Sequence, residues 1–153
     1  MEEFQLLPHK PEYKVHFEKL NKAWLEEYFT VEPIDRWVLE NPEEAILSAG
    51  GKIFFVKYRE NIIGTVALMK IGDATFELTK MAVDKNYQGI GAGKFICLSA
   101  IDEARKLNAS RLILYSQTLL KPAIGIYKQL GFSEIPLDNK YARADIKMEI
   151  LLS

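Results

Sequence analysis

The segment Gln88-Gly89-Ile90-Gly91-Ala92-Gly93-Lys94 constrains the fold more than any other part of the sequence. It follows a β-rich run at residues 75–83 and precedes residues 94–107, whose apolar positions have helical spacing. Glycines between a strand and a helix let backbone N–H groups converge on an anion at the positive end of the helix dipole. The alternative is a tight turn without a ligand, for which one glycine would suffice. Three glycines favour an anion-binding turn.

The glycine spacing excludes two common nucleotide-binding motifs. A dinucleotide-binding fingerprint needs glycine where Lys94 stands. A Walker loop needs glycine in place of Gln88 and serine or threonine in place of Phe95. A nucleotide-binding switch is therefore disfavoured, and the pattern that fits is Gln-x-x-Gly-x-Gly.

The hydrophobic pattern elsewhere predicts a mixed α/β domain. Turns at residues 59–61 and at Gly72-Asp73 join three antiparallel strands, and the helix after the glycines makes a parallel crossover to the next strand. The expected fold is one mostly antiparallel sheet. The expected strands are 53–56, 62–68, 75–83, 111–116 and 145–151, and the expected helices are 13–30, 34–40, 41–50, 94–107 and 122–130.

Composition narrows the possible functions. The 153 residues predict a single domain, 1–153, and a formal charge of −1 provides no general attraction to nucleic acid or anionic lipid. No apolar run approaches the roughly 20 residues that span a bilayer. The start, Met1-Glu2-Glu3, lacks the features of a secretory signal. Cys97, His9 and His16 supply neither an internal disulfide nor a Cys/His zinc site, so we expect a cytoplasmic protein without a metal.

Two motifs together resemble the GNAT superfamily of N-acetyltransferases. The first is Gln-x-x-Gly-x-Gly at residues 88–93, which follows Met81-Ala82-Val83 as the family's signature follows its strand. The second, residues 123–132, is similar to the family's later A-I-x-L-Y-x-K-L-G-F helix. The resemblance covers residues 53–132 well. It implies a GNAT-type sheet with helices on both faces and a parallel crossover at the acetyl-CoA loop.

The resemblance also implies a cofactor site that needs no metal. Acetyl-CoA would bind through its pyrophosphate at the glycine turn, and its pantetheine arm would pair with the preceding strand. Gln117 occupies the position where the family often has an asparagine that contacts the cofactor or its water. The implied residues are Met81, Ala82, Val83, Gln88, Gly89, Ile90, Gly91, Ala92, Gly93, Lys94 and Gln117. Lys94, Lys121 and Lys128 either neutralise the phosphates or are ordinary solvated lysines.

Acetyl transfer to an amine needs a base and an acid, because an alkylamine titrates near 10 and a leaving thiolate near about 8.5. Glu77 is the candidate base, since it lies eleven positions before Gln88 (88 − 77), where some family members carry one. The alternative is a strand-end carboxylate in solvent. Tyr127 matches the family's general acid, and its alternative is an aromatic packed on the core. The Val83 N–H would polarise the carbonyl. Cys97 is either a ping-pong nucleophile or, as its apolar stripe favours, a core residue.

The acceptor is less constrained. Residues 26–44 contain seven acids and one base, Arg36, which predicts either a cationic acceptor or a solvated helix face. Arg143 instead suggests a substrate carboxylate and an amino-acid-like acceptor. The aromatic residues in the same segment could serve either of two roles: they line a pocket, or they pack in the core, which is the role we expect. The acids are Glu26, Glu27, Glu32, Asp35, Glu40, Glu43 and Glu44, and the aromatics are Trp24, Tyr28, Phe29 and Trp37.

The sequence therefore predicts an N-acetyltransferase that works by direct attack in a ternary complex on a small-molecule or peptide amine. The alternative is a non-catalytic acyl-CoA-binding module that acts as a sensor or interaction partner. Homodimers are frequent in the family, so a homodimer is one expected assembly.

Overall fold

A computed structural model describes residues 3–29 and 31–152 and contains a seven-stranded sheet of order β1-β2-β3-β4-β5-β7-β6. The β4–β5 pair is parallel and the other pairs are antiparallel. The predicted mostly antiparallel sheet with a parallel crossover is confirmed. The strands are β1 (Phe4–Pro8), β2 (Lys52–Tyr58), β3 (Asn61–Lys70), β4 (Thr75–Val83), β5 (Arg111–Ser116), β6 (Ser133–Ile135) and β7 (Ile146–Leu151).

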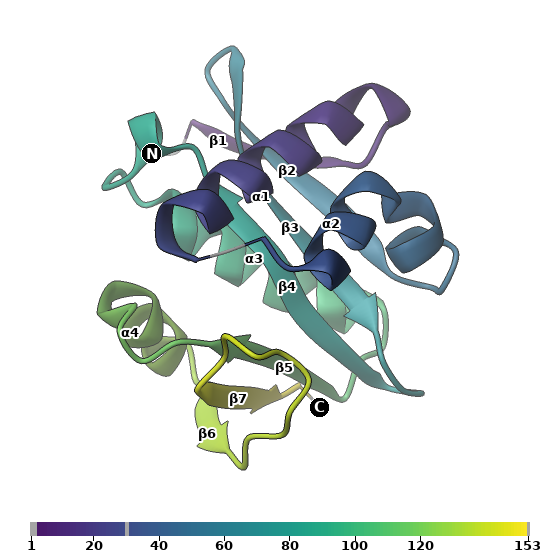
Figure 1. Ribbon diagram of the computed structural model, residues 1–153, viewed down its shortest axis with the longest axis vertical. Helices are drawn as coiled ribbons and strands as arrows, with labels where there is room; N and C mark the ends of the chain where they lie inside the picture. The colour runs from purple at the N-terminus through teal and green to yellow at the C-terminus, as the bar shows by residue number, and fades with distance from the viewer. Residues whose placement is uncertain (1–2, 30, 153) are drawn as a thin grey trace.

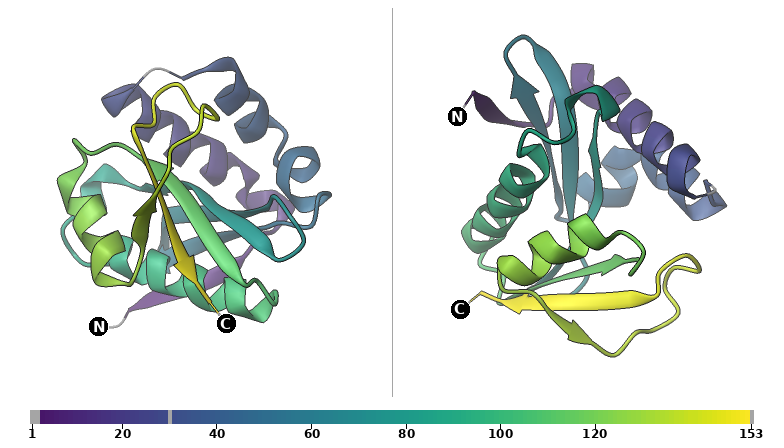
Figure 2. Two further views of the ribbon diagram at one scale, coloured as in Figure 1. Left: turned by 90° about the horizontal axis from the view of Figure 1, so that it is seen from below. Right: turned by 90° about the vertical axis from the view of Figure 1, so that its left-hand side faces the viewer.

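Helices cover both faces of the sheet (Figures 1 and 2). Helices α1 (Lys14–Tyr28) and α2 (Pro33–Glu40) lie with the π-helical turn η2 (Glu43–Leu47) on one face, where Phe17, Leu39 and Ile46 are fully buried. Helices α3 (Ala92–Lys106) and α4 (Lys121–Gln129) pack on the opposite face around a second core. Short 3-10 turns are η1 (Pro11–Tyr13) and η3 (Lys85–Tyr87). The sheet therefore separates two cores, each sealed by its own helices.

Most predicted elements are confirmed, with three differences. Strands β1 and β6 were not predicted, since they are five and three residues long and lie at the two edges of the sheet. The helix expected at residues 41–50 is a short π-helical turn, in which the Ser48 N–H donates to the Glu43 carbonyl. The predicted helix end at Thr30 and the domain ends at Met1, Glu2 and Ser153 lie outside the described residues.

Strands β4 and β5 pair over only part of their length. Their register runs from Thr75 to Glu77 on β4, and beyond that point the two strands diverge (Figure 1). A bulge in β4 accompanies the divergence, because Val66 of β3 faces both Lys80 and Met81. Lys80 has a φ of 55°, a conformation that is rare outside glycine. The carboxyl-terminal part of β4 thus has a partner strand on one edge only.

Candidate active site

The glycine turn has the conformation that its sequence requires. Gly89 and Gly91 have φ values of 83° and 95°, and Gly91 is the N-cap of α3. A Cβ at either glycine would meet no atom within 4 Å, so open space borders the backbone at both positions. The turn thus presents an exposed backbone at the amino end of a 15-residue helix, where N–H groups lack partners within the helix.

The open edge of β4 leaves the Val83 N–H directed away from β3. Asp84 donates its N–H to the Ile63 carbonyl, which makes Asp84 and Ile63 a hydrogen-bonded pair. Hydrogen-bonded and non-hydrogen-bonded pairs alternate along an antiparallel ladder. The next pair, Val83 and Gly64, is therefore non-hydrogen-bonded. The Val83 N–H faces the side from which β5 has diverged. Val83 provides a backbone donor at an unpaired strand edge.

A cavity of about 680 Å³ joins the glycine turn to the open edge of β4 and continues to the end of α1. Both predicted catalytic residues, Tyr127 and Glu77, line it. Ile90, which is 43% exposed, does not line it. The predicted cofactor residues that do line it are Met81, Ala82, Val83, Gln88, Gly89, Gly91, Ala92, Gly93, Lys94 and Gln117.

Tyr127 lies on α4 and is nearly buried between the cavity and the core. Its ring packs edge to face on Phe132, with centroids 5.9 Å apart. Burial raises the pKa of Tyr127, and the neighbouring Cys97 adds to this effect. The hydroxyl therefore keeps its proton at neutral pH. This side chain both packs on the core and faces the cavity. The prediction of a general acid and the alternative of a core aromatic are therefore compatible for Tyr127.

Glu77 is not the solvent-exposed carboxylate that the sequence left open, because it is 1% exposed on β4. Its Oε1 accepts a hydrogen bond from Lys140 Nζ, and its Oε2 accepts one from the Tyr141 hydroxyl at 2.8 Å. Burial raises the pKa of Tyr141, and the charge of Glu77 raises it further. Sequence reasoning missed Lys140 and Tyr141 as partners of Glu77, since they are more than 60 positions away.

A buried ion cluster lies beside Glu77. Asp35, which is fully buried, contacts Lys80 Nζ at 3.1 Å and accepts two hydrogen bonds from Arg143 at 2.7 and 2.9 Å. Burial alone would raise the pKa of Asp35, but Lys80 and Arg143 outweigh it and lower the pKa. Asp35 therefore does not belong to an exposed acidic face. The guanidinium of Arg143 is already paired, which disfavours its predicted role toward a substrate carboxylate.

Lys80 is a site residue that sequence reasoning missed. Its side chain is 4% exposed, and burial lowers its pKa against the opposing effect of Asp35. Leu78 and Ala82, two positions away on either side, are also buried. A lysine between two apolar residues of a buried strand needs a carboxylate partner. This pattern was the sequence signal that indicated a buried, paired lysine.

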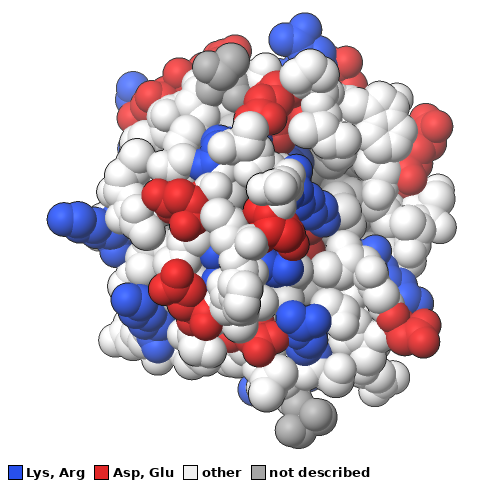
Figure 3. Space-filling model, turned by 60° about the horizontal axis from the view of Figure 1, so that its bottom comes forward, with Lys and Arg blue, Asp and Glu red and all other residues white. Residues whose placement is uncertain are grey.

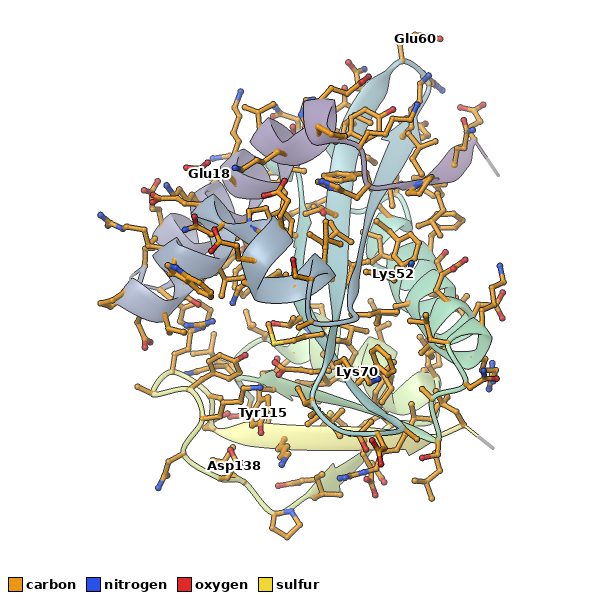
Figure 4. The ribbon with its side chains drawn as sticks, turned by 90° about the vertical axis from the view of Figure 1, so that its right-hand side faces the viewer. Glu18, Lys52, Glu60, Lys70, Tyr115 and Asp138 are labelled. Carbon is orange, nitrogen blue, oxygen red and sulfur yellow. The ribbon has the colours of Figure 1, made fainter. Side chains whose placement is uncertain are left out.

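Gln117 ties β5 to the loop before β7. Its side-chain amide donates to the backbone carbonyl of Arg143. The next residue, Thr118, donates from its N–H and its hydroxyl to Asp145, each at 2.8 Å. In the same region the Tyr115 hydroxyl donates to Asp138 at 2.8 Å, and Figure 4 labels both residues near β7. Lys121 and Lys128 are exposed and lie outside the cavity lining.

Three aromatic residues expected in the core instead line the far end of the cavity. Trp24, Tyr28 and Phe29 form a cluster with ring centroids 5.4 to 6.5 Å apart. Trp24 and Phe29 also pack against the α1-side core. Trp37 lies elsewhere and is 48% exposed. On the face drawn in Figure 3, acidic and basic side chains are interspersed, and neither forms a continuous patch.

Cys97 is buried, and burial raises its pKa to about 12. A thiol with this pKa is neutral at physiological pH and a poor nucleophile. The described residues contain no group of three or more His, Cys, Asp or Glu that would hold a metal ion. Nor is any helix in that part of the chain long and apolar enough to cross a membrane.

Comparison with known proteins identifies the class that this fold and site define. The model of the acetyltransferase (GNAT) family matches residues 14–132, and the chain belongs to that family. N-acetyltransferase 8B of Homo sapiens is 28% identical over 97 residues, which are 60% of this chain and 43% of the relative. The mycothiol acetyltransferase of Saccharomonospora viridis is 34% identical over 67 residues, 44% of this chain and 22% of the relative. The chain thus spans less than half the length of these curated relatives.

Solved structures share the fold over nearly the whole chain. An acetyltransferase of the GNAT family from Staphylococcus aureus Mu50 superposes with a TM-score of 0.86 at 23% identity, covering 98% of this chain and 99% of that one. Spermidine N-acetyltransferase from Vibrio cholerae, in complex with CoA and spermine, has a TM-score of 0.75 at 20% identity. The superposition covers 98% of this chain and 96% of that one. At these identities the likeness establishes the fold.

Proposed function

We propose that this chain transfers the acetyl group of acetyl-CoA to a primary amine by direct attack in a ternary complex. The observation that carries the proposal is one continuous cavity that contains the unpaired Val83 edge, Tyr127 and Glu77. Membership of the acetyltransferase family supports the same reaction. The alternative is an acyl-CoA-binding module without turnover, which requires neither a base nor an acid.

The cofactor end of the cavity suits acetyl-CoA. Backbone N–H groups of the glycine turn would bind the pyrophosphate, and Lys94 would add a positive charge. The open backbone at Gly89 and Gly91 leaves room for phosphate oxygens to approach. Residues 81–83 would pair with the pantetheine arm as a neighbouring strand would, on the edge that β5 leaves free.

In the transfer step the amine nitrogen forms a bond to the carbonyl carbon while the carbon–sulfur bond breaks. The Val83 N–H would stabilise the developing negative charge on the carbonyl oxygen. Tyr127 would donate its hydroxyl proton to the departing thiolate. Glu77 would receive the proton that the amine loses. Its oxygens each accept one hydrogen bond in this structure and each retain a second lone pair.

The test combines binding and turnover. Thiol release from acetyl-CoA is followed with a panel of polyamines, amino acids, aminoglycosides, arylalkylamines and lysine peptides, and CoA binding is followed by thermal shift. We expect Tyr127→Phe to lower kcat by about 100-fold, the lower range for a general acid, and to leave the CoA shift unchanged. Tyr58→Phe, outside the cavity lining, is the matched control. CoA binding without turnover on any amine would contradict the transferase proposal and favour the binding module.

The assembly and location expected from the sequence remain predictions. A homodimer would elute at twice the mass of the 17.5 kDa chain in size-exclusion chromatography with light scattering. The cytoplasmic location is tested by fractionating cells that express the tagged full chain.

A further inference from the structure

The acceptor end of the cavity is aromatic. Trp24, Tyr28 and Phe29 surround it from the end of α1, and Leu25 and Asn21 lie beside them. Tyr141 closes the other side, with its ring packed edge to face on Tyr115 at a centroid distance of 5.1 Å. This wall lies at the opposite end of the cavity from the glycine turn. The surface offered to the body of an acceptor is therefore mostly rings.

The charges at this end are balanced among themselves. Four charged residues line the cavity, and one of them, Lys94, belongs to the glycine turn. Glu77 is paired with Lys140, while Lys80 and Arg143 are paired with Asp35, to which Glu32 adds a contact with Arg143 at 3.5 Å. Three carboxylates thus meet three cations. No net charge remains there to compensate a second charge on the acceptor.

Burying an uncompensated ion is expensive, and disrupting an existing buried pair to compensate it is expensive as well. An additional ammonium or carboxylate placed beside this paired cluster would meet one of these two penalties. An aromatic body meets neither, and it gains from stacking or edge-to-face contact with the rings already present. The balanced charges and the ring-lined wall therefore select for the same kind of molecule.

We propose that the acceptor is an arylalkylamine, a primary amine on an aromatic body without a second charge. This inference rests on the proposed function and concerns the substrate class of the same site. It disfavours both classes of acceptor that the sequence suggested. The acids expected to attract a cation include the buried and paired Asp35, and the arginine expected to bind a carboxylate is held by that same residue.

The experiment compares four amines that differ in one feature at a time. These are 2-phenylethylamine, its carboxylated analogue phenylalanine, the aliphatic hexylamine, and the diamine 1,5-diaminopentane. We expect kcat/KM for 2-phenylethylamine to exceed that for hexylamine by about tenfold, the value of an aromatic contact. The kcat/KM for phenylalanine should fall about 100-fold below that for 2-phenylethylamine, and the kcat/KM for the diamine about 100-fold below that for hexylamine, because each brings a second charge. The proposal would be overturned if phenylalanine or 1,5-diaminopentane, which carry a second charge, gave the highest kcat/KM.

Variants locate the selectivity. Trp24→Leu should abolish most of the preference for 2-phenylethylamine over hexylamine, and Phe29→Leu should reduce it, while CoA binding stays unchanged. Trp37→Leu is the matched control, since it removes an indole from the exposed side of α2. A preference that survives both cavity variants would overturn the assignment of the aromatic wall.

A binding measurement separates this inference from the proposed function. The chain has two tryptophans, so Trp37→Phe leaves Trp24 as the sole indole reporter. In the presence of CoA, 2-phenylethylamine should change the fluorescence saturably, and 1,5-diaminopentane should not. Saturable aromatic binding without turnover would contradict the transferase proposal and leave the ligand class standing. Turnover of 1,5-diaminopentane without binding of 2-phenylethylamine would support the transferase proposal and contradict the arylalkylamine assignment.

Discussion

The two ends of the cavity are built from different kinds of parts. The end proposed to bind the cofactor lies along the backbone of two adjacent stretches, residues 81–83 and residues 88–94 without Ile90. The other end consists of side chains from α1, β4 and the loop before β7, and Asp35 of α2 pairs with two of them, Lys80 and Arg143. A backbone site tolerates many side chains, provided that the glycines remain. A site made of paired side chains depends on every partner, so single substitutions should affect the two ends differently.

The strongest way to break the acceptor end is Asp35→Asn. It leaves Lys80 and Arg143 buried without their shared carboxylate, and breaking a buried pair costs about 3–5 kcal/mol. We expect the free energy of unfolding in urea to fall by that amount. The control is Glu40→Gln on the same helix, which removes a half-exposed partner of Lys22 and should cost less than about 1 kcal/mol. Equal losses of unfolding free energy in the two variants would show that the buried cluster stabilises the fold no more than an exposed ion pair does.

The effect of Asp35 should depend on pH in a defined direction. Its pKa is lower in the folded protein, so it contributes stability above its unfolded value of about 3.9, and that contribution is lost as pH falls through the folded pKa. The gap in unfolding free energy between wild type and Asp35→Asn should therefore be full at pH 7 and narrow on acidification below about pH 4. Urea unfolding at a series of pH values measures it. A gap that widens toward acid would contradict the assigned pairing.

A smaller effect is expected when the cofactor end is changed. Gly91→Ala forces a residue with a side chain into the left-handed region, which costs about 1–2 kcal/mol, equivalent to about tenfold in CoA affinity if the turn distorts. Calorimetric titration with CoA measures it. Gly125→Ala is the matched control, because Gly125 lies within α4 with open space at its Cβ, and this change should be neutral or stabilising by up to about 1 kcal/mol. Weaker CoA binding in the control alone would contradict the account.

The smallest expected effect concerns Cys97. Because burial raises its pKa to about 12, the native protein should show almost no thiol reactivity toward a disulfide reagent at pH 8, and the unfolded chain should show one thiol. Cys97→Ala should keep turnover within a few-fold of wild type. A fast native reaction, or loss of turnover in the variant, would support an acetylated cysteine and a ping-pong scheme.

The contrast between the two ends also explains what the sequence could predict. Glycine conformation and strand-to-helix order are local, so residues 88–94 predict an anion-binding turn without knowledge of the fold. The contiguous motif at residues 123–132 likewise predicts a role for Tyr127, which lies at the cavity. The acidic face predicted to include Asp35 is wrong for this residue, because its partners Lys80 and Arg143 lie 45 and 108 positions away along the chain. The apolar residues that flank Lys80 indicate a buried lysine, but no pattern in neighbouring residues shows which carboxylate neutralises it.

The missed strands have a similar cause. Strand β1 is five residues long, ends at Pro8 and pairs only with β2, so its formation depends on a neighbour 46 or more positions along the chain (54 − 8). Proline at the end of an edge strand is tolerated because the free edge needs no N–H donor. Short edge strands form when a sheet is present to receive them, and local propensity gives little sign of them.

The central claim is that one cavity holds both substrates at the same time, and the most direct measurement is the initial rate with acetyl-CoA and 2-phenylethylamine varied against each other. We predict reciprocal plots that intersect, as direct attack in a ternary complex requires. Parallel lines would mean that the acetyl group is first passed to the protein, which would contradict the account.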